Sequence, residues 1–490
     1  MNKCKTIMIQ GTGSNVGKSI IVTGLCRILK EDGFRVAPFK AQNMSLNSFV
    51  TKKGLEMGRA QVTQAIAAKV EPDVRMNPVL LKPNSDNGSQ VILNGKPIGN
   101  FKAKNFYQSK KKLLAEALKA FNSLAQENEI IVLEGAGSCA EINLRENDIV
   151  NMGMAQAIHA PVLIVGDIDK GGVFAHFIGT YEVLDIKDQN LIKGFLINKF
   201  RGDKSLLNSA IDFVTKRTNV PILGILDWMH DLKLPEEDSV EYSKKLGKVA
   251  FSEECTINIA VIALPHMSNF TDFDPFEIEA DVNITFINST DEIEKFDVII
   301  IPGTKNTIAD YLFLEQKGFV EVIRRIADEK RIVGICGGYQ ILGKEICDPK
   351  SIESATKKIE ALALLNHSTE IVKEKYLSQT KAIIQDTAMN IKGYEIHHGQ
   401  TISKDKSFIV NSKSESIGTV NKNGNIWGTY LHGVFENDNF RNFFLNDIRL
   451  EKGKEKKFSF FTIENELDKL TSLLRKNLDM EKIYRIIGVK

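Results

Sequence analysis

The chain has 490 residues, more than one ordinary domain of roughly 100–200 residues, so two or three domains are expected. Its 64 Lys and Arg residues nearly balance 62 Asp and Glu residues, and the net charge of +2 leaves no basic footprint for nucleic acid. Six scattered cysteines form no CxxC pair, which argues against a disulfide framework or zinc site and fits a reducing cytoplasm. No apolar run reaches the roughly 18 residues of a membrane span, and the first residues lack a signal peptide's apolar stretch. We therefore expect a cytoplasmic protein that neither binds nucleic acid nor spans a membrane.

Short apolar runs alternate with helical patterns in the first half of the chain. Buried strands are expected at residues 6–10, 35–39, 129–135, 160–167 and 192–199. Residues 18–33, between the first two runs, have helical spacing and end in a glycine. This strand–helix–strand order predicts a parallel sheet with helices on both faces.

A second α/β series follows a stretch near residues 228–256 that is rich in acidic residues and loses periodicity. Its strands are expected at residues 257–265, 282–288, 296–303, 331–338 and 424–433. The fold class is therefore α/β with two domains. The boundaries we expect are a phosphate-loop domain at 1–228, a linker at 229–256, a second α/β domain at 257–450 and a helical tail at 451–490.

The segment GTGSNVGKS, residues 11–19, follows a predicted strand and opens a predicted helix. Its glycines let backbone N–H groups converge on phosphate oxygens, Lys18 supplies a positive charge, and the Ser19 hydroxyl suits Mg²⁺. The alternative is an incidental Gly-Lys-Ser turn, and the strand–loop–helix context argues against it. The loop residues expected to bind ATP are Gly11, Thr12, Gly13, Asn15, Gly17, Lys18 and Ser19.

The loop is one residue longer than the usual phosphate loop, whose first glycine would stand at Thr12 instead of Gly11. This longer form resembles the loop of dethiobiotin synthetase-like ATPases. The resemblance implies phosphorylation of a carboxylate followed by attack of nitrogen. It also implies that Glu134, at the end of a predicted strand, holds Mg²⁺ together with Ser19. A helix cap or surface acid is the alternative for Glu134.

Three further polar residues end predicted strands, where ligands gather in open α/β sheets. Asp167 and Asp169 could bind the metal, bind substrate or cap the next helix, and we predict Asp167 as a metal ligand. Asn198 is expected to read the adenine edge of ATP, with a turn-forming Asn as the alternative. ATP and Mg²⁺ are therefore the expected cofactors.

Cys336 stands at a corner between a predicted strand and a helical pattern, with Gly334, Gly337 and Gly338 around it. A helix N-terminus favours the thiolate form of a cysteine, which is its nucleophilic form. The N–H of Gly337 would then face a developing oxyanion, and the neighbourhood of Gly303 could give a second donor. The alternative for Cys336 is a small core side chain at a tight corner.

His432 follows the last predicted strand, about a hundred residues after Cys336. A cysteine with a distant histidine is typical of a nucleophile and its base. The pair resembles the class I glutamine amidotransferases, which hydrolyse L-glutamine through a cysteinyl thioester and release ammonia. Most of them carry a glutamate two residues after the histidine, where Val434 stands here, and this departure matches the cobyrinate-type branch. The group that orients His432 must lie elsewhere, and Glu436 is the candidate from sequence proximity.

Several long polar stretches are similar to the cobyric acid synthase family over about residues 5–445. They lie at residues 39–48, 58–68, 76–91, 166–175, 234–240, 264–276 and 393–401. The resemblance implies a ligase that uses ATP and L-glutamine. Its substrate would be adenosylcobyrinic acid a,c-diamide, whose b, d, e and g carboxylates would be amidated in turn.

The stretch KAQNMSLNS, residues 40–48, is dense in amide and hydroxyl groups. Composition alone favours a surface loop, and only the resemblance points to substrate binding. The residues expected to bind the substrate are Lys40, Gln42, Asn43 and Ser45. His397 and His398 are not assigned a catalytic role, although one of them could approach the cysteine.

Two other functions remain as alternatives. Cobyrinic acid a,c-diamide synthase shares both domains, and the stretches 40–48 and 166–175 favour the later synthase. A partitioning ATPase with an inactive second domain often carries a lysine early in its phosphate loop, where Gly13 stands here. A homodimer is one assembly compatible with the sequence.

Overall fold

The computed structural model describes residues 4–85, 88–229, 232–235 and 251–489. Most of the predicted linker, residues 230–231 and 236–250, lies outside the described residues, and so does the end of the stretch 234–240. The chain forms two compact units, and neither is continuous in sequence. The first unit comprises Met1–Ser45, Glu56–Glu237 and Thr462–Lys490. The second comprises Leu46–Leu55 and Asp238–Phe461.

The first unit is built on a six-stranded sheet in which every neighbouring pair is parallel. Its strands in spatial order are β2 (Val36–Phe39), β9 (Ile130–Glu134), β1 (Lys5–Gly11), β10 (Val162–Asp167), β11 (Ile192–Phe200) and β12 (Ile222–Asp227). Five of them fall on the five predicted strands, and β12 adds an edge. The parallel order brings the carboxyl ends of β1, β9 and β10 to one edge of the sheet.

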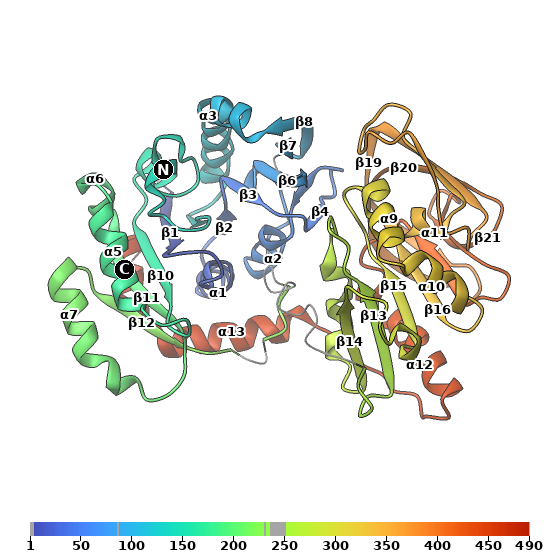
Figure 1. The fold of residues 1–490 in the computed structure, drawn as a ribbon. Coiled ribbons are helices and arrows are strands. Elements are labelled where there is room, and N and C mark those ends of the chain that lie inside the picture. The colour runs from blue at the N-terminus through green and yellow to red at the C-terminus, as the bar shows by residue number, and fades with distance from the viewer. Residues whose placement is uncertain (1–3, 86–87, 230–231, 236–250, 490) are drawn as a thin grey trace. The chain divides into compact units, whose positions relative to one another are not determined.

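Helices cover this sheet on both sides (Figure 1). They are α1 (Lys18–Glu31), α2 (Arg59–Ala67), α3 (Ala103–Glu127), α4 (Met152–Ile158), α5 (Val173–Val183), α6 (Ile186–Gln189) and α7 (Asn208–Thr218), with 3₁₀ turns η1 (Val74–Met76), η2 (Ile142–Asn147) and η3 (Lys204–Leu207). Helix α1 follows the phosphate loop, as predicted. Its apolar side chains, Ile21 and Leu25 among them, are fully buried in the core that also contains the strands.

The last two helices of the chain, α13 (Ile463–Asn477) and α14 (Met480–Ile487), belong to the first unit (Figure 1). Leu470 and Leu474 of α13 are fully buried in the same apolar core as α1. The contact is close, because a Cβ atom added at Gly24 would lie 2.1 Å from Cδ1 of Leu474. Arg475 adds an ion pair of 2.8 Å with Asp32 at the end of α1. The helical tail predicted from the sequence therefore completes the core around α1.

A smaller four-stranded sheet, which the sequence pattern did not predict, lies beside this core in the first unit. Its strands in order are β3 (Gln42–Met44), β6 (Val79–Ser85), β7 (Gly88–Leu93) and β8 (Lys96–Lys102). β3 pairs with β6 in parallel, and the other two pairs are antiparallel. Strand β5 (Glu56–Gly58) then leads into α2. The polar run 40–45 is thus partly a strand and not a surface loop.

The second unit contains an eleven-stranded sheet whose first five strands are parallel. These are β14 (Val282–Ile287), β13 (Ile257–Ile262), β15 (Val298–Ile301), β16 (Arg331–Ile335) and β23 (Ile426–Thr429). All five coincide with predicted strands. The two-unit α/β fold class is therefore confirmed.

The other six strands extend this sheet and were not predicted. They are β22 (Ser416–Val420), β21 (Lys406–Asn411), β19 (His367–Ile384), β20 (Met389–Ser403), β17 (Glu345–Cys347) and β18 (Lys358–Glu360). The long antiparallel hairpin of β19 and β20 shifts register between Ile371 and Tyr376. Strand β4 (Ser48–Val50) and the turns η4 (Phe270–Ile278), η5 (Ile293–Lys295) and η6 (Val434–Glu436) also belong to this unit.

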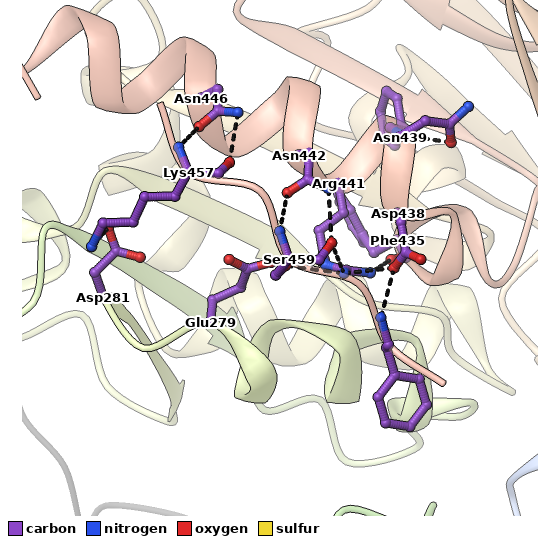
Figure 2. A network of polar contacts seen from close by, with 12 residues as sticks. Glu279, Asp281, Phe435, Asp438, Asn439, Arg441, Asn442, Asn446, Lys457 and Ser459 are labelled. Atoms are coloured by element: carbon purple, nitrogen blue, oxygen red, sulfur yellow. Dashed lines mark hydrogen bonds and ion pairs between the residues drawn. The ribbon is translucent and has the colours of Figure 1, made fainter. Parts of the chain in front are cut away.

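Among its described residues, the second unit contains the helices α9 (Thr307–Gln316), α10 (Phe319–Ile326), α11 (Gly337–Leu342) and α12 (Asp438–Glu451). The chain then runs back along α12, as Figure 2 shows. Asn446 exchanges two hydrogen bonds of 2.8 Å with the backbone of Lys457. Asn442 does the same with Ser459, at 2.9 and 3.0 Å. This returning segment leads directly to α13 of the first unit.

A buried ionic network ties α12 to the end of η4. Arg441 donates from Nε to Oε1 of Glu279 at 3.0 Å, and Arg449 contacts Glu279 at 3.2 Å and Asp281 at 2.7 Å. Both arginine side chains have 0% exposure, so their charges are compensated inside the protein. Figure 2 shows Glu279 facing Arg441 and Ser459.

Across the described parts of the chain, every helix is too short or too polar to cross a lipid bilayer.

Candidate functional site

Cys336 lies at a sharp corner between β16 and α11 in the second unit. Its φ of +51° and ψ of −105° are a conformation that a residue with a side chain rarely adopts. Space forces glycine at the neighbouring positions, because a Cβ at Gly338 would lie 1.9 Å from the carbonyl oxygen of Ile301. A Cβ at Gly334 would likewise lie 2.6 Å from the carbonyl oxygen of Gly338. Such a strained, glycine-lined corner is more than a core cysteine requires.

His432 follows β23, the strand next to β16, and is 1% exposed. Its backbone exchanges two hydrogen bonds with Tyr394 of β20, at 2.9 and 3.2 Å. The Tyr394 ring stacks on the imidazole with centroids 5.2 Å apart and planes inclined by 17°. The same strand brings the carbonyl oxygen of Ile396 to 3.6 Å from Sγ of Cys336. The cysteine and histidine that the sequence paired are thus neighbours in space.

The group that orients His432 is Asp272, and not Glu436 as sequence proximity suggested. Oδ2 of Asp272 lies 2.7 Å from Nδ1 of His432, and Oδ1 accepts the N–H of Gly433 at 2.9 Å. Asp272 is 2% exposed, whereas Glu436 is an exposed residue of η6. Asp272 lies in the stretch 264–276, which is similar to the family, but no sequence motif marks it as the partner of a residue 160 positions later.

The electrostatics of this cluster favour the protonated form of His432. Burial opposes protonation of His432, but the Asp272 carboxylate and the Cys336 sulfur together raise its pKa to about 10. Hydrogen bonds from both residues add to the rise. Because Asp272 engages Nδ1, Nε2 is the ring nitrogen left for Cys336. The arrangement places a protonated imidazole beside the cysteine sulfur, as a nucleophile and its acid–base partner require.

The two predicted oxyanion residues border this pair. A Cβ at Gly303, which follows β15, would lie 3.1 Å from Cε1 of His432 and 3.7 Å from Cβ of Cys336. Gly337 is the first residue of α11, where backbone N–H groups have no acceptor within the helix. A Cβ there would meet Thr304 at 2.5 Å. The neighbouring order of β15, β16 and β23 therefore gathers Gly303, Cys336 and His432 at one edge.

The phosphate loop in the first unit is curled around Lys18. Its Nζ donates to the carbonyl oxygens of Gly13 at 2.9 Å and Gly137 at 3.0 Å. Asn15 has a φ of +59° and Gly17 a φ of +100°, so the loop uses the left-handed region twice. A Cβ at Gly17 would lie 2.1 Å from Nδ2 of Asn198, which explains why glycine stands there.

Asn198 closes the loop from β11. Its Nδ2 donates to the carbonyl oxygen of Val16 at 2.8 Å, and its buried Oδ1 has no hydrogen-bond partner among the described residues. A buried acceptor without a partner is costly, so it is available to a donor on a ligand such as the adenine amino group. Lys199, which the sequence pattern did not single out, donates to the carbonyl oxygen of Asn15 at 2.8 Å and pairs with Asp167 at 2.9 Å.

Glu134 is the polar centre of this edge of the sheet and is 1% exposed. It accepts hydrogen bonds from Ser19 at 2.8 Å, Lys40 at 2.9 Å and Gln64 at 2.5 Å. Burial opposes its ionisation, but the Lys40 charge and these hydrogen bonds lower its pKa below the ordinary value. The structure therefore joins the loop, the predicted metal ligand and a predicted substrate residue in one cluster.

This cluster fits Mg²⁺ in its ligand chemistry. Mg²⁺ prefers oxygen ligands and is usually bound by one or two carboxylates together with substrate phosphates. Ser19 Oγ and Glu134 Oε1 are two such oxygens beside the loop, 2.8 Å apart. Asp167 is engaged elsewhere, because Oδ2 pairs with Lys199 and Oδ1 accepts the N–H of Asp169 at 3.0 Å. Its role as a metal ligand stays a prediction.

The other predicted substrate residues line β3 and its ends. Asn43 is 2% exposed and donates from Nδ2 to Oε1 of Gln61 at 3.1 Å. The N–H of Ser45 donates to the carbonyl oxygen of Leu81 at 3.0 Å. The buried Oε1 of Gln42 has no hydrogen-bond partner among the described residues. A polar ligand with amide or carboxyl groups could satisfy such an atom.

His397 and His398 take structural positions. The His397 ring stacks on Tyr430 with centroids 3.8 Å apart, and its Nδ1 lies 2.8 Å from the carbonyl oxygen of Gly399. His398 is 7% exposed, with Nδ1 3.1 Å from the carbonyl oxygen of Val372. Neither is the partner that the structure gives to Cys336.

Comparisons with known proteins match a family domain to each half of the chain. Residues 7–241 match the CobQ/CobB/MinD/ParA nucleotide binding domain, and residues 258–440 match the CobB/CobQ-like glutamine amidotransferase domain. The cobyric acid synthases of Clostridium botulinum (strain Loch Maree / Type A3) and Dehalococcoides mccartyi (strain CBDB1) are 48% and 47% identical, and each match covers 99% of both chains. The adenosylcobalamin biosynthesis bifunctional protein CobDQ of Leptospira interrogans is 46% identical over 99% of this chain, which spans 57% of that protein's length.

Proposed function

Because the chain belongs to the cobyric acid synthase family of glutamine-dependent ligases, we propose that it amidates the b, d, e and g carboxylates of adenosylcobyrinic acid a,c-diamide. ATP and L-glutamine are the co-substrates, and the product is adenosylcobyric acid. The observation that carries the proposal is the presence, in one chain, of the Cys336–His432–Asp272 cluster and the Glu134-centred phosphate loop. We place this reaction in the cytoplasm.

The second unit supplies ammonia. The Cys336 thiolate attacks the side-chain carbonyl carbon of glutamine, and the N–H groups near Gly303 and Gly337 stabilise the oxyanion. His432, held by Asp272, gives its proton to the departing ammonia and leaves a thioester on the sulfur. Water, activated by the neutral imidazole, then releases glutamate and restores the thiolate. Each cycle therefore consumes one glutamine and one water.

The first unit activates the carboxylate. The loop N–H groups and Lys18 bind the phosphates of ATP, and Asn198 faces the base. Mg²⁺ held by Ser19 and Glu134 would neutralise charge on the transferred phosphoryl group. The substrate carboxylate takes the γ-phosphoryl group and becomes an acyl phosphate, with ADP as the leaving product. Ammonia then displaces phosphate and forms the amide.

The substrate lies along the run that contains Gln42, Asn43 and Ser45, where amide and hydroxyl groups suit its carboxylates and amides. Lys40 begins this run and pairs with Glu134 at 2.9 Å. It therefore supplies positive charge where the carboxylate and the γ-phosphoryl group must meet. We also propose that Asp167 supports the metal side of the loop, through Lys199 or by direct ligation.

Separation of the two nitrogen sources tests the proposal. Cys336→Ala abolishes amidation from glutamine and leaves amidation from ammonium salts, because only the source of ammonia is lost. Lys18→Ala abolishes amidation from either source. A Cys336→Ala protein that is inactive with ammonium, or a Lys18→Ala protein with normal turnover, contradicts these roles.

Product mass distinguishes the substrate. With the a,c-diamide, glutamine and ATP, four successive replacements of OH by NH₂ are expected. Cobyrinic acid, offered in parallel, is the control substrate. Amidation of cobyrinic acid alone would assign the chain to the preceding a,c-diamidation step.

A further inference from the structure

One short segment leaves the first unit and belongs to the second. The chain is part of the first unit up to Ser45 and again from Glu56, but Leu46–Leu55 packs with the second unit. We call this segment the crossing loop. It contains β4 (Ser48–Val50) and closes with hydrogen bonds between Thr51 and Leu55 of 2.8 and 3.3 Å. The crossing loop follows directly after the residues proposed to bind substrate.

The crossing loop is joined to the start of η4 by a reciprocal pair of asparagines. Oδ1 of Asn47 accepts the N–H of Phe270 at 3.0 Å, and Oδ1 of Asn269 accepts the N–H of Ser48 at 3.0 Å. Both asparagines are buried, at 0% and 2% exposure. Each side chain therefore satisfies a backbone donor of the other segment.

This pair lies one turn before Asp272. Asn269 has a φ of +55° and precedes η4, and its carbonyl oxygen accepts the N–H of Asp272 at 3.0 Å. Asp272 in turn contacts His432 and Gly433. The position of the carboxylate thus depends on a backbone turn whose first two residues are held by the crossing loop, Asn269 by Ser48 and Phe270 by Asn47.

A second contact reaches His432 through the face of its ring. The ring of Phe49 packs on Tyr394 with centroids 5.2 Å apart, and Tyr394 stacks on His432. Val50 is fully buried in a small apolar cluster with Tyr394 and Ile396. Gln379 donates from Nε2 to the carbonyl oxygen of Val50 at 2.9 Å, which fixes the loop on β19. The crossing loop therefore supports both the carboxylate and the aromatic ring that flank the imidazole.

We propose that the crossing loop is a positioning element of the glutamine-hydrolysing centre, in which Asn47 and Asn269 position Asp272 by fixing the start of η4, and Phe49 positions Tyr394. The inference rests on the proposed function, because it assumes that His432 serves Cys336 in glutamine hydrolysis. Asn47, Phe49 and Asn269 are positioning residues and do not contact the reacting atoms. They act by holding the imidazole where Nε2 can exchange a proton with the thiol. Through this loop, a segment bounded on both sides by the ATP-binding unit holds the acid–base pair of the other unit.

Three full-length variants test this role. Asn47→Ala removes the acceptor for Phe270, and Phe49→Leu removes the ring that packs on Tyr394. Asn269→Gly removes the acceptor for Ser48, while glycine still accepts the positive φ. In each variant, the kcat for glutamine hydrolysis should fall about 10- to 100-fold with little change in KM, since misplacement of a catalytic group affects the chemical step. Alkylation of Cys336 by iodoacetamide should slow at neutral pH, and its pH profile should shift.

Matched controls separate positioning from general disturbance. Asn439→Ala is the same exchange at an exposed asparagine of the second unit that donates one hydrogen bond of 3.1 Å to Asn390. Phe458→Leu removes a ring that is 68% exposed. Both should keep the glutamine kcat and the alkylation profile. Amidation from ammonium should remain normal in all five variants, because the ATP-binding unit is unchanged.

The outcomes are distinct. An Asn47→Ala or Asn269→Gly protein with wild-type kcat and alkylation profile overturns the positioning role. Parallel loss of glutamine- and ammonium-dependent amidation also overturns it, since the loop would then act on folding or on the ligase reaction. If an asparagine variant does not fold, Phe49→Leu, the mildest change, provides the test. A wild-type kcat and alkylation profile in that variant would also overturn the positioning role. Persistence of glutamine use in Cys336→Ala would instead refute the proposed function itself.

Discussion

Oδ2 of Asp272 lies 2.7 Å from Nδ1 of His432, although the two residues are 160 positions apart. In most class I amidotransferases the residue that makes this contact is a glutamate two positions after the histidine. Here Val434 stands at that position, 1% exposed, and a residue from η4 takes over the contact. In the proposed reaction, this carboxylate fixes the ring orientation and stabilises the imidazolium.

Asp272→Asn should therefore lower the kcat for glutamine hydrolysis by about 100-fold or more, since an amide cannot stabilise the imidazolium. Amidation from ammonium should not change. The matched control is Glu436→Gln, which neutralises the exposed acid nearest in sequence and should keep full glutamine use. Equal losses in the two variants, or a larger loss for Glu436→Gln, would return the orienting role to Glu436.

The pKa of His432 makes a prediction about stability and pH. Its folded-state value of about 10 exceeds the ordinary 6.5, so the folded protein holds this proton more tightly than the unfolded chain. The resulting stabilisation is complete below pH 6.5 and is lost as the pH rises towards 10. The contribution of this imidazolium to the free energy of unfolding should therefore decline as the pH rises through this range. Urea unfolding of the wild type and His432→Gln measures it, and the difference between them should shrink with rising pH.

His367 serves as a comparison within the same protein, because its pKa is lowered whereas that of His432 is raised. Burial lowers the pKa of His367 to about 4, and its ring nitrogen Nε2 lies 3.0 Å from the carbonyl oxygen of Tyr339. The folded protein therefore keeps it neutral, and stability is lost as the pH falls from 6.5 towards 4. A His432→Gln protein should lose the alkaline slope and keep the acidic one. Retention of both slopes would show that another group titrates above pH 6.5.

The parallel strands were predictable from sequence because both of their faces are buried. Residues 160–167 and 296–303 are nearly continuous apolar runs, which is the pattern of a strand covered by helices. The hairpin of β19 and β20 mixes Lys, Glu and Thr with apolar residues and has one open face, so its composition resembles a surface segment. The small sheet around β3 was not predicted for a different reason. Strand β3 has only three residues, too few to show an alternating pattern.

The site residues also divide into those that the sequence could predict and those that it could not. Lys18, Ser19 and Cys336 sit within local motifs, so their sequence neighbours already identified them. Asp272 and Lys40 gain their meaning only from tertiary contacts with His432 and Glu134. No spacing rule links residues that meet through the order of strands in a sheet. For the pair of His432 and Asp272, the sequence therefore predicted one partner and not the other, whereas Lys40 and Glu134 were both predicted but their contact was not.

Glu134 makes a prediction about Mg²⁺ and nucleotide binding. Glu134→Gln should remove the gain in ATP affinity that Mg²⁺ gives the wild-type protein, because the carboxylate ligand beside Ser19 is lost. Calorimetric titration of ATP with and without Mg²⁺ measures the gain. Asp167→Asn in the same titration tests the second predicted ligand, since loss of the gain there as well would make it a metal ligand. An unchanged gain in Glu134→Gln would exclude the proposed metal site.

The contact between α1 and α13 makes opposite predictions for two glycines. A Cβ at Gly24 would lie 2.1 Å from Leu474, whereas a Cβ at Gly179 in α5 would have nothing within 4 Å. Gly179→Ala should therefore stabilise the protein by about 0.5–1 kcal/mol through helix propensity alone. Gly24→Ala gains the same propensity but forces a methyl group into a packed contact, which costs about 1–3 kcal/mol. Its net effect should be a loss of stability.

A double variant identifies the cause of that loss. Leu474→Ala alone should cost about 2–5 kcal/mol, because it leaves a cavity under α13. In Gly24→Ala with Leu474→Ala, the new methyl group enters the space that the leucine left. The loss should then be smaller than the sum of the single losses by about 1 kcal/mol or more, which is the coupling expected of residues in contact. Strict additivity in urea unfolding would mean that α13 does not pack on α1 at Gly24, and that the C-terminal helices are held to the first unit elsewhere.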